Sequence, residues 1–183
     1  MTEPGFTATL HGSETLGDRI MKVNHAGEQG AIAVYATQRW IARWRAPEMV
    51  AELTDFLAHE RRHRALFAAE LAARGRARCR SYHLCALAGV TAGTVTGLMG
   101  RGAIAATTVA IERVVLHHLT LQLAALDGQD AAACATIRAI IAEEQEHHDC
   151  SAARLGAPKL LERIIDRAIA SATRAVIWLG MRL

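Results

Sequence analysis

The amino-acid sequence predicts an all-α fold, a four-helix bundle assembled from two similar helical hairpins. Hydrophobic residues make up 51% of the 183-residue chain, while only 4% are aromatic and 3 are proline, a composition typical of a helical protein. Apolar residues recur at helical spacing through several long segments. A pattern of glutamates and histidines also occurs twice, once in each half of the chain. We therefore expect one domain over residues 1–183, with residues 1–17 as an N-terminal tail.

The first half of the chain predicts two helices separated by a proline. The first extends from about Asp18 to Arg45 and carries a broad stripe of apolar and small residues. Pro47 cannot continue that helix but suits the first turn of the next one, which ends near Gly75. These two helices form the first predicted hairpin.

The second half predicts another hairpin and a final helix. One helix extends from about Gly102 to Leu126 and ends at an Asp-Gly turn. The next spans about Asp130 to Leu155, followed by Gly156, a normal C-terminal signature. The last helix extends from Lys159 to the end of the chain.

Residues 75–101 join the two hairpins and are too numerous for a short turn, so we expect a long crossover, as in ferritin-like bundles. Residues 84–100 within it contain no charged side chain. This segment is marginal in length for a membrane span and is interrupted by glycines. The sequence favours a buried or membrane-touching helix over a span.

The repeated pattern is Glu…Glu-x-x-His. Its members are Glu28, Glu60 and His63 in the first half and Glu112, Glu144 and His147 in the second. The interval from the upstream glutamate to the second one is the same in both halves, and the midpoint of each pair falls at a predicted turn. In an antiparallel hairpin, residues equidistant from the turn lie at the same height. The two residues of each Glu-x-x-His share one helix face. The six side chains are therefore expected to meet in the bundle core as ligands of a dinuclear metal site.

The chemistry of these residues favours redox-active metals. Four carboxylates in a core repel one another unless cations neutralise them, and two divalent ions would balance four negative charges. An oxygen-rich set with two imidazoles suits iron or manganese, whereas structural zinc prefers sulfur ligands. Such a site leaves coordination positions open for dioxygen, so the sequence indicates an enzyme rather than a structural metal clip.

The run from Val23 to Ala31, Val-Asn-His-Ala-Gly-Glu-Gln-Gly-Ala, together with both Glu-x-x-His elements, resembles the demethoxyubiquinone hydroxylase family of di-iron monooxygenases. The likeness continues through the Thr107–Glu112 run into the last helix. It implies that the family's six iron ligands correspond to the six residues of the repeated pattern, which would hold two iron ions. It also implies a late step of ubiquinone biosynthesis, in which one oxygen atom of dioxygen enters the ring of a polyprenyl demethoxyquinol. Members of this family bind the membrane peripherally.

Two further residues are candidate catalytic side chains. Tyr35 lies two turns after Glu28 on the same face and is either a hydroxyl beside the ligands or a core residue. His118 corresponds to a family histidine near the metals and the quinone pocket, yet an ideal helix points it about 120° away from Glu112. It therefore acts from beside the ligands, or the helix turn is locally widened. Leu119 stands where the family typically has tyrosine, which leaves the exact quinol and its tail length open.

The remaining features bear on location and partners. The last helix is amphipathic, which fits an in-plane membrane helix and a packed fifth helix equally well. Arginine clusters at residues 39–45, 61–64 and 74–80 are expected to be solvated helix faces, with anionic lipid as the second interpretation and no nucleic-acid partner. Gly27 and Gly30 indicate either close backbone approach beside the metals or tight helix packing. The other notable histidines are expected at the surface or beside ligands: His25, His59, His117 and His148.

The N-terminus lacks signal-peptide character, and the four cysteines are expected to be reduced and mostly buried thiols. We therefore expect a cytoplasmic protein, peripheral on the inner face of the cell membrane. A lipid-presenting protein and a second copy of the chain are further candidate partners, and the electron donor is left open. Two alternatives remain: another ferritin-like di-iron or di-manganese redox protein, such as a peroxidase or metal oxidase, and a non-enzymatic metal-binding membrane-associated protein.

Overall fold

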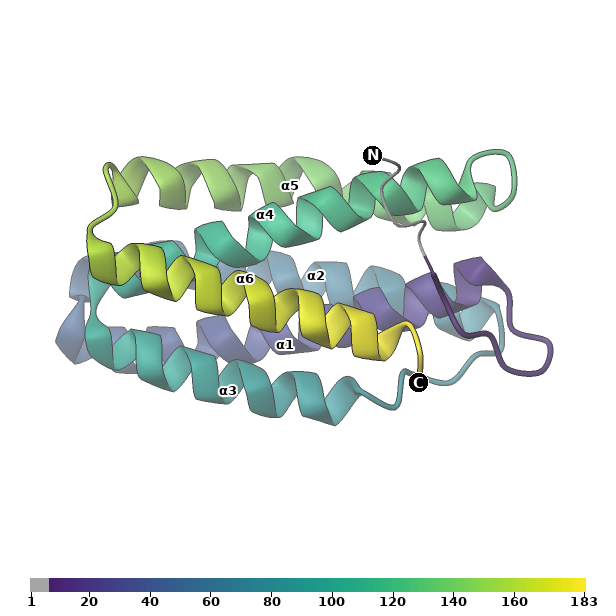
Figure 1. Ribbon diagram of the computed structural model, residues 1–183, viewed down its shortest axis with the longest axis horizontal. Coiled ribbons are helices and arrows are strands. Elements are labelled where there is room, and N and C mark those ends of the chain that lie inside the picture. Colours follow the sequence, from purple (N-terminus) through teal and green to yellow (C-terminus); the bar gives the residue numbers. More distant parts are fainter. Residues whose placement is uncertain (1–6) are drawn as a thin grey trace.

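A computed structural model describes residues 7–183, which form six α-helices and one 3₁₀ turn, with no strand in that range (Figure 1). The predicted all-α fold is confirmed. The elements are α1 (Leu16–Arg45), η1 (Pro47–Met49), α2 (Val50–Ala73), α3 (Tyr82–Met99), α4 (Arg101–Leu126), α5 (Ala131–Leu155) and α6 (Leu160–Gly180).

Helix α1 begins slightly earlier than predicted, because Thr15 caps it. The Thr15 hydroxyl accepts a hydrogen bond from the Asp18 backbone N–H at 3.1 Å, and the Asp18 carboxylate accepts one from the Thr15 N–H at 3.0 Å. This reciprocal pair satisfies two N–H groups that the first turn leaves without helical partners. Leu16 and Gly17 therefore belong to the helix and not to the predicted tail, of which residues 1–6 lie outside the described part of the chain.

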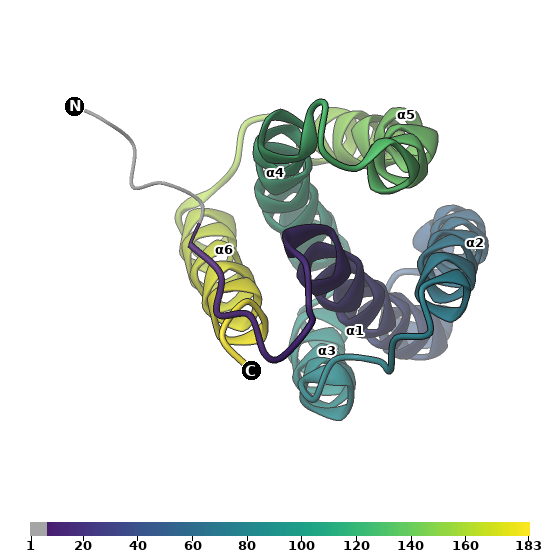
Figure 2. The same cartoon turned by 90° about the vertical axis from the view of Figure 1, so that its right-hand side faces the viewer.

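Helices α1 and α2 form one antiparallel hairpin, and α4 and α5 form the other (Figure 2). The first hairpin turns through η1, which begins at Pro47 as expected for a residue suited to a first helical turn. The second turns at Gly128, whose positive φ of 68° is a conformation that glycine adopts without strain. Both breaks lie where the ligand spacing predicts them.

Helix α3 forms most of the crossover and packs along α1 (Figures 1 and 2). A Cβ at Gly89 would lie 2.3 Å from the Gly30 carbonyl oxygen, and one at Gly93 would lie 2.7 Å from that of Val34. The glycines of α3 therefore allow its backbone to contact α1 directly. Gly30 faces Cys85 of α3, so helix packing accounts for it. Gly27 has no such neighbour, since no heavy atom of another described helix lies within 4 Å of its Cβ position.

The opposite face of α3 is exposed and apolar. Only 28% of this helix is buried, so of the predicted buried or membrane-touching helix, burial applies to one face alone. The exposed large side chains on it are Leu84, Leu87, Val90, Val95, Leu98 and Met99. Judged by length and composition only, both α3 and α4 could cross a membrane. The core helix of a soluble protein can meet the same criterion.

Helix α6 packs against α4, so it is a fifth helix on the bundle. Ile165 and Ala170 are buried in this contact. The apolar side chains of this amphipathic helix are not all buried, because Leu161 and Ile164 are more than half exposed while Ile165 is buried. Apolar side chains therefore remain on the outer surface of α6.

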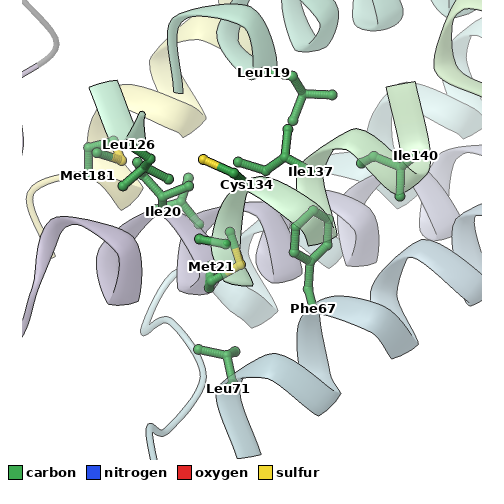
Figure 3. Close-up of a cluster of buried hydrophobic side chains, with 12 residues drawn as sticks. Ile20, Met21, Phe67, Leu71, Leu119, Leu126, Cys134, Ile137, Ile140 and Met181 are labelled. Atoms are coloured by element: carbon green, nitrogen blue, oxygen red, sulfur yellow. The ribbon is translucent and has the colours of Figure 1, made fainter. Parts of the chain in front are cut away.

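Two apolar clusters fill the bundle core. The first core cluster joins α1, α2, α4 and α5 around Met21, Phe67 and Ile137, and includes Cys134 and Leu119 (Figure 3). The second core cluster draws on later residues of α1 and earlier residues of α2, with Ile104 of α4. The segments of α1 and α2 between the two clusters carry the first copy of the repeated pattern, Glu28, Glu60 and His63. Cys79 and Cys85 are also buried and Cys150 is exposed, and all four thiols are free.

Arg74 closes one end of the bundle. Its guanidinium binds both carboxylate oxygens of Asp130 at 2.7 and 2.8 Å, and it also contacts Glu70 and Asp18. Asp130 caps α5 by accepting a hydrogen bond from the Ala133 N–H. One arginine thus links the end of α2 to the first turns of α1 and α5, which holds the two hairpins in register.

Candidate metal centre

The six residues of the repeated pattern meet in the interior of the bundle. Four helices supply them, with one glutamate from each of α1 and α4 and a Glu-x-x-His element from each of α2 and α5. Each residue is 7% exposed or less: Glu28, Glu60, His63, Glu112, Glu144 and His147.

These residues form two overlapping groups, each able to hold a metal ion. One consists of Glu28, Glu60, His63 and Glu144, and the other of Glu60, Glu112, Glu144 and His147. The ligand atoms within each group lie within 4.8 Å of one another. Glu60 and Glu144 belong to both groups, so they can bridge two metal positions.

Three polar atoms that face one another in the site have no hydrogen-bond partner among the described residues. His63 Nδ1 lies 2.9 Å from Glu144 Oε1, and His147 Nδ1 lies 3.3 Å from Glu60 Oε1. Both Nδ1 atoms and Glu60 Oε1 are buried, and none of the three has a hydrogen bond of suitable geometry to any described residue. Buried polar atoms in this state are costly unless a cation binds them. The residues present therefore fit divalent metal ions.

The electrostatics of the four glutamates support the same assignment. In the absence of metal, burial raises the pKa of Glu60 to about 7 and that of Glu144 to about 8. Burial, followed by the neighbouring carboxylates, raises the pKa values of Glu28 and Glu112 well above the usual range. Burial also lowers the pKa of His147, which favours the neutral ring needed for metal binding. Two divalent cations would stabilise the ionised carboxylates.

The Nε2 atoms of His63 and His147 also have close polar partners. His63 Nε2 lies 2.7 Å from Glu143 Oε2, and Arg62 holds the other oxygen of that carboxylate at 2.8 Å. His147 Nε2 lies 3.0 Å from His59 Nδ1. Such partners orient metal-binding imidazoles. Sequence reasoning missed Glu143, although its offset from His59 equals the offset that relates the two motifs.

Tyr35 is both a core residue and a neighbour of the residues of the repeated pattern. It is fully buried, with its ring 5.8 Å from that of Phe56 in the second core cluster. Its hydroxyl donates a hydrogen bond to the Glu112 carboxylate on α4. The two interpretations left open by the sequence therefore both apply.

A cavity of about 150 Å³ extends from the glutamates between α1, α3, α4 and α6. Its lining is mostly aliphatic, and Ala88 of α3 and Ala172 of α6, both exposed, mark where it reaches the surface. Asn24 and Gln122 also line it and exchange two amide hydrogen bonds of 2.8 and 2.9 Å. Neither amide was anticipated from the sequence.

His118 lines this cavity instead of joining the carboxylates. Helix α4 is continuous through this region, so no widened turn brings the ring toward Glu112. His118 Nδ1 is buried without a hydrogen-bond partner among residues 7–183, and burial lowers its pKa. Leu119, 2% exposed, packs in the first core cluster and also borders the cavity.

Three of the other histidines do not contact the glutamates of the repeated pattern. His25 is buried, so the expected surface position is wrong for it, and its ring stacks on Tyr82 with centroids 5.1 Å apart. His117 is exposed, and His148 contacts Asp149 at 2.9 Å. Of the four histidines expected at the surface or beside ligands, His59 is the one that contacts a residue of the repeated pattern.

Comparisons with known proteins agree with this site. The family model described as "Ubiquinone biosynthesis protein COQ7" matches residues 15–180, a range that contains all six motif residues. The 3-demethoxyubiquinol 3-hydroxylase of Rhodospirillum rubrum is 31% identical over 166 residues, covering 91% of this chain and 78% of that protein.

Two mitochondrial proteins named NADPH-dependent 3-demethoxyubiquinone 3-hydroxylase are also similar. The one from Dictyostelium discoideum is 31% identical over 177 residues, and the one from Homo sapiens is 30% identical over 172 residues. Each alignment covers 91% of this chain and 77% of the relative. With its two buried Glu/His groups and this match over nearly its whole length, the chain belongs to the COQ7 family of ubiquinone biosynthesis proteins.

Proposed function

We propose that this protein is a 3-demethoxyubiquinol 3-hydroxylase, an oxidoreductase that inserts one oxygen atom of dioxygen into the ring of a polyprenyl demethoxyquinol. One observation carries the proposal: two buried Glu/His groups share Glu60 and Glu144 beside an apolar cavity. The names of the relatives give the substrate class, and the cavity gives an apolar quinol a route to the carboxylates.

The proposed metal ligands are the six residues of the repeated pattern, and the proposed metals are two iron ions. Glu28 and His63 would bind one ion, Glu112 and His147 the other, and Glu60 and Glu144 both. Carboxylate and imidazole donors suit iron. Bound iron would supply the activation of dioxygen.

The cavity supports a quinol over the small polar substrates of a peroxidase or metal oxidase. Its walls are aliphatic apart from the glutamates and a few polar groups, which include the Asn24–Gln122 pair and His118. A quinol ring could bind near the glutamates while its polyprenyl tail leaves between α3 and α6, where Ala88 and Ala172 are exposed. Apolar walls with few polar groups are usual for sites that bind apolar ligands.

His118 and Tyr35 have different proposed roles. His118 presents an unpartnered Nδ1 in the cavity wall, which could hydrogen-bond a ring hydroxyl and hold its proton. Tyr35 does not line the cavity, so it would act through Glu112 by fixing the orientation of that carboxylate. Leu119 offers no hydroxyl to the substrate, which leaves recognition of the ring to the amide pair and His118.

We also propose peripheral membrane attachment, on the inner face of the cell membrane, through the outer surfaces of α3 and α6. The exposed apolar residues of α3 and of α6 flank the cavity opening, and Trp178 on α6 is 56% exposed. Trp40 and Trp44 pack edge to face on the surface of α1, beside exposed Arg43 and Arg45. Exposed aromatic and cationic side chains of this kind favour the interfacial region of an anionic bilayer.

Quinone profiling tests the function. Deleting the gene should cause demethoxyubiquinone to accumulate, and a restored copy should remove it. A copy with Glu60→Gln should fail to do so, whereas Glu146→Gln, a matched change at an exposed glutamate, should succeed. An unchanged quinone pool in the deletion strain would refute the proposal.

Purified protein gives the second test. Metal analysis should find two iron ions per chain, and the loaded protein should hydroxylate a short-tailed demethoxyubiquinol supplied with dioxygen. NADPH is the first electron source to supply, because the mitochondrial relatives are named NADPH-dependent. Manganese in place of iron would refute the metal assignment.

A further inference from the structure

One more pair of residues, outside the two motifs, is related by the same sequence offset as the motifs themselves. His59 and Glu143 directly precede Glu60 and Glu144, so the same sequence offset relates them. Each reaches the histidine of the opposite hairpin: His59 on α2 contacts His147, and Glu143 on α5 contacts His63. The two halves of the site thus exchange supporting contacts through equivalent positions.

These equivalent positions carry chemically different side chains. An ionised carboxylate such as Glu143 can only accept, so His63 Nε2 must donate at 2.7 Å and its Nδ1 lone pair faces the glutamates. His147 Nε2 contacts an imidazole nitrogen of His59 at 3.0 Å, which is a neutral acceptor when His147 binds metal through Nδ1. A carboxylate partner increases the basicity of a ligand imidazole more than a neutral partner does.

A second equivalent pair departs from symmetry in the same direction. Tyr35 and Leu119 are related by the same offset as the two motifs. The Tyr35 hydroxyl donates to Glu112 and draws negative charge from that carboxylate. Leu119 has no polar side-chain atom, so it gives Glu28 no corresponding hydrogen bond. Glu28 therefore keeps more of its charge for a metal ion than Glu112 does.

We propose that the two metal positions are unequal, and that the one formed by Glu28 and His63 binds divalent metal more tightly than the one formed by Glu112 and His147. Glu143 and His59 are the positioning residues that create most of the difference, and the Tyr35–Glu112 hydrogen bond adds to it. They act through the ligand histidines and do not touch the cavity. This inference rests on the proposed dinuclear centre but not on the identity of its substrate.

Titration of the purified, chelator-treated protein with Co²⁺ tests the inference, because the visible absorption of Co²⁺ reports its ligands. The unchanged protein should bind two ions in two resolved steps. Glu143→Gln, which keeps an acceptor but removes the charge, should weaken the first step by roughly 10-fold, and Glu143→Ala by up to about 100-fold. The second step should weaken less, because Glu143 Oε2 lies 3.9 Å from His59 Nδ1 and reaches His147 only through that ring. Glu146→Gln is the control, since it removes the same charge from an exposed position on α5.

The decisive variant is His59→Glu, which makes the two equivalent positions identical. It should strengthen the second step and bring it closer to the first, with the Tyr35–Glu112 hydrogen bond as the remaining difference, a result that general damage to the fold could not produce. His59→Gln keeps a neutral acceptor and should preserve two steps. Helical circular dichroism verifies that each variant is folded.

Two equal steps in the unchanged protein would overturn the inference, as would equal weakening of both steps by Glu143→Gln. The hydroxylation assay separates this failure from failure of the proposed function. Equal Co²⁺ affinities together with quinol hydroxylation would refute only the inequality. Unequal affinities in a protein that does not hydroxylate the quinol would refute only the function.

Discussion

The hydroxyl of Tyr35 on α1 donates a hydrogen bond to the carboxylate of Glu112 on α4, across the interface between the two hairpins. The phenol ring is fully buried against Phe56, so core packing holds the donor in place. A residue of the core thereby fixes the orientation of a proposed metal ligand, which couples the stability of the bundle to the geometry of the site.

Tyr35→Phe should therefore affect turnover more than the fold. The substitution keeps the ring and removes the hydrogen bond, which should lower kcat for quinol hydroxylation about 10-fold. KM should be unchanged because Tyr35 does not line the cavity. Steady-state kinetics measure both constants. Tyr82→Phe is the matched control, since that hydroxyl donates to Gln29 outside the metal groups, and equal losses of kcat in both variants would contradict the prediction.

Filling the cavity should raise KM without removing metal. Ala88 lines the cavity near its exposed end, and Ala88→Phe would obstruct the path proposed for the polyprenyl tail. We expect KM for the quinol to rise about 10-fold, roughly the effect of losing 1.4 kcal/mol of binding energy. Leu87→Phe, on the exposed face of the same helix and outside the cavity lining, should leave KM unchanged. Loss of iron from the Ala88 variant would show that the effect is not on substrate access.

The metal-free protein should become less stable as pH rises from 6.5 to about 8.5. Burial raises the pKa of Glu60 to about 7 and of Glu144 to about 8, so the folded protein retains protons that the unfolded chain releases above its ordinary pKa of 4.5. Stability is therefore lost as pH rises through the folded values. Buried histidines with lowered pKa values, such as His25 and His118, act in the opposite direction, but only below 6.5.

Urea unfolding with a chelator present measures this dependence. Protein loaded with two metal ions is the control, because bound cations keep the carboxylates ionised and remove the decline over this range. A chelated protein that is more stable at the higher pH would contradict the expected sign.

Gly27 of α1 and Gly89 of α3 should respond oppositely to alanine. Gly89→Ala would place a Cβ 2.3 Å from the Gly30 carbonyl oxygen, and separating the two helices should cost about 1–3 kcal/mol of unfolding free energy. Gly27 has open space at its Cβ position, so Gly27→Ala should stabilise α1 by up to about 1 kcal/mol through helix propensity. Chemical denaturation of both variants provides the comparison. Similar losses in the two would indicate that the direct packing of α3 on α1 contributes little.

The helices and the six residues of the proposed metal site could be predicted from the amino-acid sequence. Helical periodicity and turn residues act locally, so the predicted boundaries lie within a few residues of the structure, apart from the cap at Thr15 and the 3₁₀ turn at Pro47. The spacing of Glu28 from Glu60 and of Glu112 from Glu144 about their turns was enough to bring the carboxylates level. The composition of residues 84–100 likewise indicated an apolar helix in the crossover.

Which side chains support the site, and where the cavity lies, is evident only from the packing of the helices. Contacts such as Tyr35 with Glu112 and Glu143 with His63 join different hairpins, and they depend on interhelical angles and distances that no local pattern specifies. Periodicity gave the direction of His118 relative to Glu112, but not that it faces a cavity between α4 and α6. The Glu…Glu-x-x-His pattern repeats in the sequence because each hairpin carries one copy, whereas its supporting contacts exist only once the two hairpins pack together.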